Sequence, residues 1–355
     1  MTPASQPPSA SGGQIMHRAA LIEDAIHEFR ARRARKKGFL ATVIPYTGYG
    51  STQWVRILGR VVLAKEARPG SRAERKHLKR EESVRGWRSF ISVHVADVPV
   101  QVEIAGTKHE VWPDRGGVID TRIEVALEPG WHTARLSVTE SEREFDAPVY
   151  VVSPETQYGI ISDVDDTVMV TALPRPLLAA WNTFVLNEHA RVPPPGMSVL
   201  LERLAQQNAG APVVYLSTGA WNVAPTLRRF LSRNLFPAGP LLLTDWGPTH
   251  DRLFRSGIEH KRTNLARLAG EFPNLRWFLI GDDGQHDEKL YAEFVNEHPR
   301  NVAAVLIREL SGSEAVFAGG RSALEKRHEL KGVPWFYSPN GAGLSSQLTH
   351  AEFLS

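Results

Sequence analysis

The sequence predicts an α/β fold, a three-layer Rossmann-like parallel sheet preceded by a smaller β-sandwich-like domain. Three observations support this prediction. Up to Ser153 the chain shows short strand-like runs separated by turn residues. After Pro154 such runs alternate with helix-like stretches, which is typical of a parallel sheet covered by helices. The length of 355 residues is more than one hydrophobic core normally organises, so two domains are expected.

The composition excludes several classes of function. With 42% hydrophobic and 23% charged residues, it is typical of a globular protein. The formal net charge is only +3, so no overall field favours nucleic acid and no such partner is expected. Cysteine is absent, which excludes disulfides and thiolate chemistry. Without a long apolar run or a leader pattern, we expect a cytoplasmic protein with no transmembrane segment, whose membrane contact is at most peripheral.

The first 37 residues divide into two segments. Residues 1–15 are rich in Pro, Ser and Gly and poor in large apolar side chains, which predicts a disordered lead. Residues 16–37 show apolar positions at helical spacing and end in a cluster of Arg and Lys, which predicts a basic amphipathic helix. Cations at a carboxyl end stabilise the helix itself, and contact with an anionic membrane is the alternative.

The segment 38–153 is predicted to be β-rich. Its strand signals are WVRILGRVVLA, SFISVHV, VPVQVEIAG, GVIDTRIEVAL, HTARLSVTE and APVYVVS. Their spacing predicts an antiparallel sandwich or a small barrel. A basic insertion at 66–88 interrupts them, with eight basic residues and three acidic ones between Arg68 and Arg88. Such a run is either a solvated surface or a contact with a phosphate-bearing membrane.

The segment 154–355 is predicted to hold a parallel sheet. The strand signals are GIISDVDD, PVVYLST, LRWFLIGDD and NVAAVLI, and the helical stretches lie at 196–207, 223–234, 261–270 and 287–297. In such folds ligands bind at the carboxyl ends of the strands. From Ser311 onward the residues have no chemical interpretation, and covering a sheet edge is one possible role.

Acidic side chains follow two of these strands. Asp163 and Asp165 are two positions apart after the first strand, so both side chains can face one cavity. Asp282 and Asp283 end the third strand, and Asp287 lies one helical turn later. Two acidic clusters at one sheet edge offer the oxygen ligands that a hard divalent cation such as Mg²⁺ requires. A turn with helix-capping aspartates is the alternative for the first cluster.

Polar and basic side chains accompany these carboxylates. Ser217, Thr218 and Gly219 follow the strand that lies between the two clusters in the chain. Lys261 is expected at the start of a helix, where its ammonium could offset the charge of phosphate and carboxylate. A hydroxyl at a strand end could hold a phosphoryl oxygen. Arg308 follows the fourth strand and is expected to be a simple surface charge.

The order of these motifs resembles a known superfamily. DVDDT, YLST, Lys261 and GDDGQHD occur in the order of the four motifs of the haloacid dehalogenase-like phosphohydrolases. In the details LSTGAWN, LLLTDWG, the HK pair and FLIGDDGQHDEKLY, the chain is similar to the phosphatidate phosphatase family typified by the actin-patch-associated enzyme of yeast. The likeness covers about 155–310 and is weaker before it. It implies an essentially uncapped haloacid dehalogenase-like domain.

The resemblance also implies catalytic roles. Asp163 would be the nucleophile that becomes an aspartyl phosphate, and Asp165 would protonate the leaving oxygen and later activate water. Thr167 would support the turn, Ser217 would hold a phosphoryl oxygen, and Lys261 would neutralise the nucleophile and the phosphate. Ala220 precedes Trp221 where the family often has proline, which leaves the local loop shape open.

The remaining implied roles concern the metal and the substrate. The candidate substrate-binding residues are Thr218, Gly219 and His286. The candidate Mg²⁺ ligands are Asp163, Asp165, Asp282, Asp283 and Asp287, with the choice between the last two left open. The implied reaction converts phosphatidate, a phospholipid at a membrane surface, to diacylglycerol and phosphate. Two alternatives stay open: hydrolysis of a phosphoprotein or a small soluble ester, and an adaptor with a vestigial catalytic domain. The protein partner of the β-rich domain is unknown.

Overall fold

The computed structural model describes most of the chain. The described residues are 29, 31–65, 93, 95–141, 143–170, 192–244, 250–284, 286–317, 320, 322 and 326–355. The predicted disordered lead, the basic insertion at 66–88 and most of the predicted helix at 16–37 lie outside them, although residues 31–36 are helical. No described helix has the length and apolarity needed to cross a lipid bilayer.

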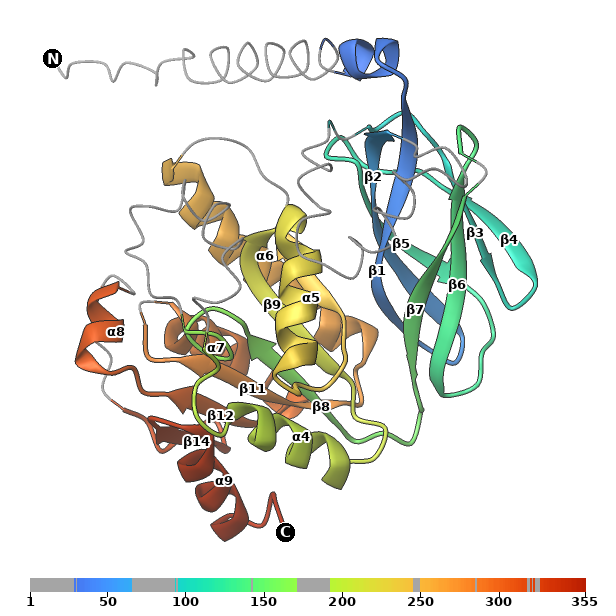
Figure 1. Cartoon of the computed structure of the whole chain (residues 1–355). Helices are drawn as coiled ribbons and strands as arrows, with labels where there is room; N and C mark the ends of the chain where they lie inside the picture. Colours follow the sequence, from blue (N-terminus) through green and yellow to red (C-terminus); the bar gives the residue numbers. More distant parts are fainter. Residues whose placement is uncertain are drawn as a thin grey trace, which may run out of the picture.

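The first half of the described chain forms one seven-stranded sheet, in the order β4-β3-β6-β7-β1-β2-β5 (Figure 1). Its strands are β1 (Phe39–Ser51), β2 (Trp54–Lys65), β3 (Val100–Ile104), β4 (Thr107–Val111), β5 (Val118–Glu124), β6 (Gly130–Val138) and β7 (Glu144–Val152). All neighbours are antiparallel except β1 and β7, which pair in parallel. Buried side chains from all seven strands form one core, so the sheet curves around its own apolar face.

Strand β1 is absent from the sequence prediction for a physical reason. Its sequence contains Pro45, Gly48 and Gly50, and such residues usually indicate turns. In the structure the pairing of β1 with β2 shifts register between Tyr46 and Tyr49, which is the signature of a bulge. A Cβ atom at Gly48 or Gly50 would collide with carbonyl oxygens of β2, so both glycines allow the close approach of the two strands.

The second half forms another seven-stranded sheet, in the order β10-β9-β8-β11-β12-β14-β13. The strands are β8 (Tyr158–Asp163), β9 (Val213–Ala220), β10 (Leu241–Thr244), β11 (Arg276–Asp282), β12 (Val302–Arg308), β13 (Glu329–Leu330) and β14 (Val333–Ser338). All neighbours are parallel except β13 and β14. The last segment, whose possible role in the sequence analysis was to cover a sheet edge, thus extends the sheet beyond β12.

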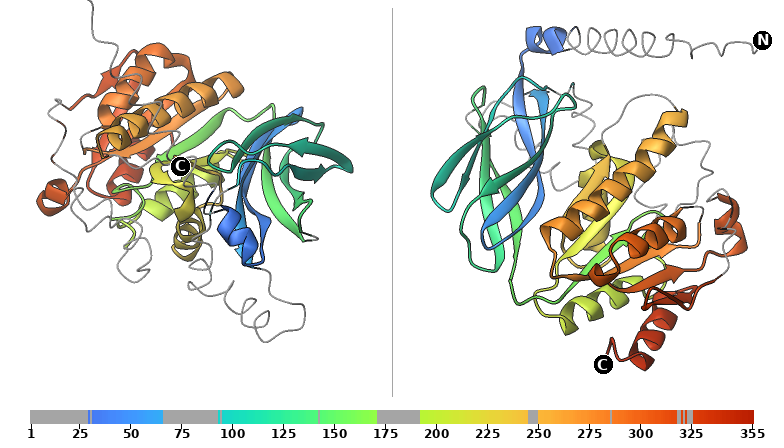
Figure 2. Two further views of the ribbon diagram at one scale, coloured as in Figure 1. Left: turned by 90° about the horizontal axis from the view of Figure 1, so that it is seen from above. Right: turned by 180° about the vertical axis from the view of Figure 1, so that it is seen from behind.

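Helices cover both faces of this second sheet (Figures 1 and 2). They are α4 (Met197–Gln207), α5 (Ala224–Arg233), α6 (His250–Glu271), α7 (Asp287–Glu297), α8 (Gly312–Phe317) and α9 (Gly341–His350), with short 3₁₀ helices η4 (Trp221–Val223) and η5 (Pro299–Asn301). Helices α4, α5 and α9 lie on one face, and α6 and α7 lie on the other. This arrangement buries the strands of the second sheet on both sides, consistent with their continuous apolar runs.

One expectation about α6 is wrong. Lys261 does not open the helix, because α6 begins at His250 and Lys261 lies near its middle. The stretch before Lys261 shows little apolar periodicity and contains Gly257, which hides the helix in the sequence. A Cβ atom at Gly257 would lie 3.0 Å from the side chain of Thr218, so the glycine lets α6 pass close to the end of β9.

Charged side chains join the two sheets. The hydroxyl of Tyr49 donates a hydrogen bond to Glu271 at 2.8 Å, and Arg56 forms an ion pair with the same carboxylate. Asp120 accepts from Arg56 at 2.6 Å and from Arg267 of α6 at 2.7 Å. The side chains of Arg56 and Glu271 are only 13% and 9% exposed, so this pair is shielded from water. Removing Glu271 would leave the buried Arg56 with Asp120 as its carboxylate partner, which compensates its charge less fully.

We therefore predict that Glu271→Ala lowers the free energy of unfolding by about 3 kcal/mol, because it leaves the Arg56 guanidinium buried beside one remaining carboxylate. The measurement is urea-induced unfolding of the full chain. Glu124→Ala is the matched control, because the Glu124 pair with Arg122 is exposed and should contribute less than about 1 kcal/mol. Equal losses for the two variants would contradict a special role for the Glu271 pair.

Candidate active site

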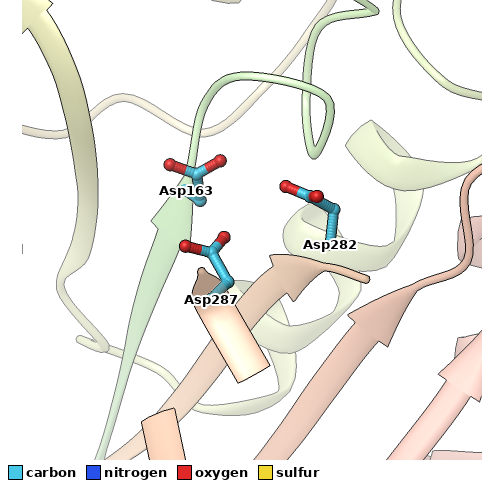
Figure 3. A group of neighbouring side chains, drawn as sticks. All are labelled: Asp163, Asp282 and Asp287. Atoms are coloured by element: carbon cyan, nitrogen blue, oxygen red, sulfur yellow. The ribbon is translucent and has the colours of Figure 1, made fainter. Parts of the chain in front are cut away.

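Three carboxylates meet at one edge of the second sheet (Figure 3). Asp163 is the last residue of β8, Asp282 is the last residue of β11, and Asp287 is the first residue of α7. Parallel strands end at the same edge, so residues far apart in the chain come together there. Carboxylate oxygens of the three residues lie within 4.8 Å of one another, and all three residues are buried.

A lysine ammonium connects two of these carboxylates. Nζ of Lys261 lies 2.6 Å from Oδ1 of Asp163 and 2.7 Å from Oδ1 of Asp287. Burial alone would lower the pKa of Lys261, but the two carboxylates raise it above its ordinary value. Burial raises the pKa of Asp163 well above its ordinary value, and the charge of Lys261 opposes this effect. The lysine therefore stays charged at neutral pH and favours an ionised Asp163.

Thr167 and a backbone amide hold Asp282. The hydroxyl of Thr167 lies 3.4 Å from Oδ2 of Asp163 and 3.4 Å from Oδ2 of Asp282, so it sits between two carboxylates. The backbone N–H of Gly284 donates to Oδ1 of Asp282 at 2.7 Å. Burial raises the pKa of Asp282 well above its ordinary value, and the neighbouring charge of Asp287 adds to this rise. These donors offset part of the cost of burying the carboxylate.

Arg308 holds the turn that follows β8, and the expectation that it is a surface charge is wrong. Its side chain is buried, donates to the carbonyl of Asp166 at 2.6 Å and pairs with Glu314 at 2.6 Å. Asp166 has φ +61°, a left-handed conformation that most residues avoid. No local pattern indicates this contact, because Asp166 lies 142 positions before Arg308. Arg308 thus positions the turn between Asp163 and Thr167.

Ser217 lies within β9, the strand that adjoins β8 on the side away from β11. Its hydroxyl donates to Oδ2 of Asp165 at 3.0 Å and accepts from the backbone N–H of Gly219 at 2.9 Å. Thr244 of β10 donates to the carbonyl oxygens of Thr218 and Gly219 at 3.0 and 3.2 Å. Ser217 is buried, whereas Asp165 is only partly buried and Thr218 is exposed. Ser217 and Asp165 therefore form a second polar pair beside the acidic cluster.

One predicted metal ligand, Asp283, is not among the converging carboxylates. The carboxylate of Asp283 accepts from the backbone N–H of Leu310 at 2.7 Å, so it holds the segment after β12. Of the two candidates left open by the sequence, Asp287 is therefore the one beside Asp163 and Asp282. His286 directly precedes α7, and its carbonyl accepts from the backbone N–H of Leu290 at 3.0 Å.

A glycine that the sequence analysis did not single out gives Asp287 its space. A Cβ atom at Gly281 would lie 2.7 Å from Oδ2 of Asp287 and 2.7 Å from the ring of Tyr291. The hydroxyl of Tyr291 donates to the carbonyl of Ile280 at 2.9 Å, which fixes that ring. The glycine directly before Asp282 in the motif FLIGDD was the signal that could have indicated this close approach.

The residues of the cluster fit a divalent cation. Three carboxylates and one ammonium leave a formal charge of 3 − 1 = 2 negatives in a buried site. Oδ2 of Asp287 is buried and accepts no hydrogen bond from the residues that the structure describes. A buried carboxylate oxygen without a donor is a natural ligand for a hard cation, and Mg²⁺ prefers oxygen ligands of this kind.

We predict that Mg²⁺ stabilises the folded chain and that Asp282→Asn removes this effect, because the variant loses a charged ligand. At Mg²⁺ concentrations of about 100 times Kd, the gain in unfolding free energy should be about 2.7 kcal/mol. The measurement is thermal unfolding with Mg²⁺ and with chelator. Asp146→Asn, at an exposed position of β7, is the control that should keep the full gain. Equal stabilisation of wild type and Asp282→Asn would contradict a metal site at this cluster.

The family comparison concerns the segment that contains this cluster. Residues 158–309 match the family model described as phosphatidate phosphatase APP1, catalytic domain. Phosphatidate phosphatase APP1 of Saccharomyces cerevisiae is 26% identical over 167 residues, which are 47% of this chain and 28% of that protein. An uncharacterized protein of Schizosaccharomyces pombe is 28% identical over 161 residues, which are 43% and 25% of the two chains. The chain thus spans about a quarter of the length of these curated relatives.

Solved structures add little to this comparison. A carbohydrate acetylesterase from Xanthomonas citri aligns over 75% of this chain and 69% of its own, at 11% identity and a TM-score of 0.25. A TM-score this low supports no conclusion about fold or function. The family match, in contrast, covers the segment that holds the acidic cluster.

Proposed function

We propose that this chain is a magnesium-dependent phosphomonoester hydrolase that forms an aspartyl phosphate on Asp163 and acts on phosphatidate. The observation that carries the proposal is the buried contact of Lys261 with Asp163 and Asp287, beside Asp282. It brings the proposed nucleophile Asp163, the ammonium of Lys261 and the Oδ2 atom of Asp287, which has no hydrogen-bond donor among the described residues, to one edge of the sheet. Phosphoryl transfer depends mostly on such positioning and charge stabilisation.

In this proposal Asp163, Asp282 and Asp287 hold the cation, since their oxygens converge within 4.8 Å. When bound, Mg²⁺ supplies positive charge that stabilises the anionic oxygens of the transferring phosphoryl group. The protein itself contributes the ammonium of Lys261 from α6. The residues of this chain therefore provide both the cation ligands and a second, permanent positive charge.

The first half-reaction transfers the phosphoryl group to Asp163. A carboxylate oxygen of Asp163 attacks phosphorus, and the bond from phosphorus to the ester oxygen breaks. Protonated Asp165 gives its proton to the leaving oxygen, which departs as an alcohol. Lys261 supports this step because its charge opposes the effect of burial, which raises the pKa of Asp163. The products of this step are the free alcohol and an aspartyl phosphate.

The second half-reaction returns the enzyme to its starting state. Asp165, now a carboxylate, accepts a proton from water, and the water oxygen attacks phosphorus. The bond between phosphorus and the Asp163 oxygen breaks, which releases inorganic phosphate. Asp165 suits both roles because it is only partly buried and already takes part in a hydrogen bond with Ser217.

Ser217 is proposed to hold a phosphoryl oxygen. Its hydroxyl donates to Asp165 in this structure, so it points toward the edge at which phosphorus would lie. Thr218, Gly219 and His286 are proposed as further substrate contacts near this edge. Thr167, placed between Asp163 and Asp282, keeps the two carboxylates apart.

The lipid substrate is supported by the family match rather than by the geometry of the cluster. Every part of the proposed mechanism would act equally well on a soluble phosphomonoester, and the basic insertion at 66–88 lies outside the described residues. Phosphatidate would bring the chain to a membrane surface, where that insertion could add electrostatic attraction. A vestigial site is disfavoured, because three buried carboxylates that repel one another serve no evident structural purpose.

We predict that Asp163→Asn lowers kcat at least about a thousandfold, because an amide cannot act as the nucleophile. The measurement is phosphate release from phosphatidate in mixed micelles and from p-nitrophenyl phosphate in solution, each with Mg²⁺ and with chelator. Asp146→Asn is again the control and should retain activity. Turnover of the soluble ester alone would keep the mechanism and remove the lipid assignment. Full activity of Asp163→Asn would remove the mechanism.

A further inference from the structure

A tyrosine of the first sheet touches the loop that follows β9. The rings of Tyr46 and Trp221 stack at a centroid distance of 4.8 Å and an interplanar angle of 13°. The hydroxyl of Tyr46 donates a hydrogen bond to the backbone carbonyl of Trp221 at 3.1 Å. Both residues are buried, at 7% and 4% exposure. One side chain of β1 therefore fixes both the ring and the backbone of Trp221.

Trp221 begins the turn that leads away from Ser217. Its carbonyl also accepts from the backbone N–H of Ala224, which closes η4 at the start of α5. Only three residues separate Trp221 from Ser217, and this segment carries the hydrogen bond from Gly219 to the Ser217 hydroxyl. A shift of the Trp221 backbone would therefore move the Ser217 hydroxyl relative to Asp165.

Among the described residues, side-chain hydrogen bonds connect the segment from Ser217 to Trp221 with three other parts of the chain. Asp165 accepts a hydrogen bond from Ser217, and Thr244 of β10 donates to the carbonyls of residues 218 and 219. Tyr46 provides the third contact, and it is the one that comes from the other sheet. The first two contacts lie within the sheet that forms the site, so the third couples the site to the β-rich half of the chain.

The position of Tyr46 is itself well determined. Tyr46 pairs with Leu58 of β2, directly before the register shift of β1. On the other side of that bulge, Tyr49 donates to Glu271, the last residue of α6. The bulge thus directs two tyrosines toward the second sheet, and the ion pair of Arg56 with Glu271 holds the same interface. Tyr46 is therefore presented to Trp221 by a fixed framework.

We propose that Tyr46 is a positioning residue for the segment from Ser217 to Trp221. It acts through Trp221 on Ser217, the residue proposed to hold a phosphoryl oxygen. This inference rests on the proposed function of Ser217 and extends it, because it makes the β-rich half a part of the catalytic machinery. The strand β1 then serves the reaction as well as the fold. Tyr46 itself does not touch the reacting groups.

The test compares three variants of the full chain. Tyr46→Phe removes the hydrogen bond but keeps the stacked ring, and Tyr46→Leu removes both. Tyr49→Phe is the matched control, because it removes a tyrosine hydroxyl from the same interface. That hydroxyl contacts Glu271 at the carboxyl end of α6, ten residues after Lys261. The readouts are kcat/KM with p-nitrophenyl phosphate, the Kd of orthophosphate measured by calorimetry with Mg²⁺, and the melting temperature.

We expect Tyr46→Phe to lower kcat/KM and to raise the orthophosphate Kd by about threefold to tenfold, and Tyr46→Leu to have the larger effect. Tyr49→Phe should change both constants less than about twofold. It should lower the melting temperature by about as much as Tyr46→Phe does. The inference is overturned if Tyr46→Phe stays within twofold of wild type in both constants, or if Tyr49→Phe matches its losses. A purely structural role would move only the melting temperature.

The same data separate this inference from the proposed function. If the wild-type chain hydrolyses no ester, the proposed function is wrong. The orthophosphate Kd values of the variants then test the positioning role of Tyr46 by themselves. A wild-type chain that also fails to bind orthophosphate overturns both. Normal turnover with an unaffected Tyr46→Phe removes only the role of Tyr46.

Discussion

The contact of Lys261 with Asp163 and Asp287 is the interaction on which the site depends. Three carboxylates within 4.8 Å of one another repel, and burial strengthens that repulsion because water no longer screens it. An ammonium less than 3 Å from two of them makes the cluster compatible with a folded protein. The site lies where the parallel strands end. There the ends of β8 and β11, the first residue of α7 and the middle of α6 come together, so the lysine can compensate the charge of the carboxylates.

The geometry of the sheets determines what surrounds this cluster. Arg308 holds the turn after β8 from β12, beyond β11, and Ser217 approaches from the adjacent strand β9 on the other side. Tyr46 of strand β1 contacts Trp221, and Tyr49 of the same strand contacts the end of α6. The two elements that supply Ser217 and Lys261 therefore both contact the β-rich half of the chain. This explains why the two sheets share a buried, charged interface rather than a flexible connection.

Local patterns in the sequence predicted a large part of this arrangement. The buried apolar runs marked β8, β9, β11 and β12, and the rule that ligands bind at their carboxyl ends brought Asp163, Asp282 and Asp287 to one site. Features that depend on distant partners could not be found in this way. Arg308 reads as a surface charge because its partners Asp166 and Glu314 come from other elements.

The same limit applies to β1 and to α6. The glycines of β1 read as turn residues, since their role is visible only beside the carbonyls of β2. The start of α6 has no apolar stripe in the sequence. The sequence pattern therefore predicts a helix from Lys261 onward, whereas α6 begins at His250. The stacking of Tyr46 on Trp221 joins residues 175 positions apart, and no local pattern encodes such a contact.

The most direct test of the account is to identify the residue that carries the phosphoryl group during turnover. The chain is quenched with acid after brief reaction with substrate and Mg²⁺, reduced with borohydride, and digested for mass spectrometry. Borohydride converts an acyl phosphate of aspartate to homoserine, which marks its position. The account predicts homoserine at Asp163 and at no other aspartate. Turnover without this mark, or with a mark on another residue, would contradict it.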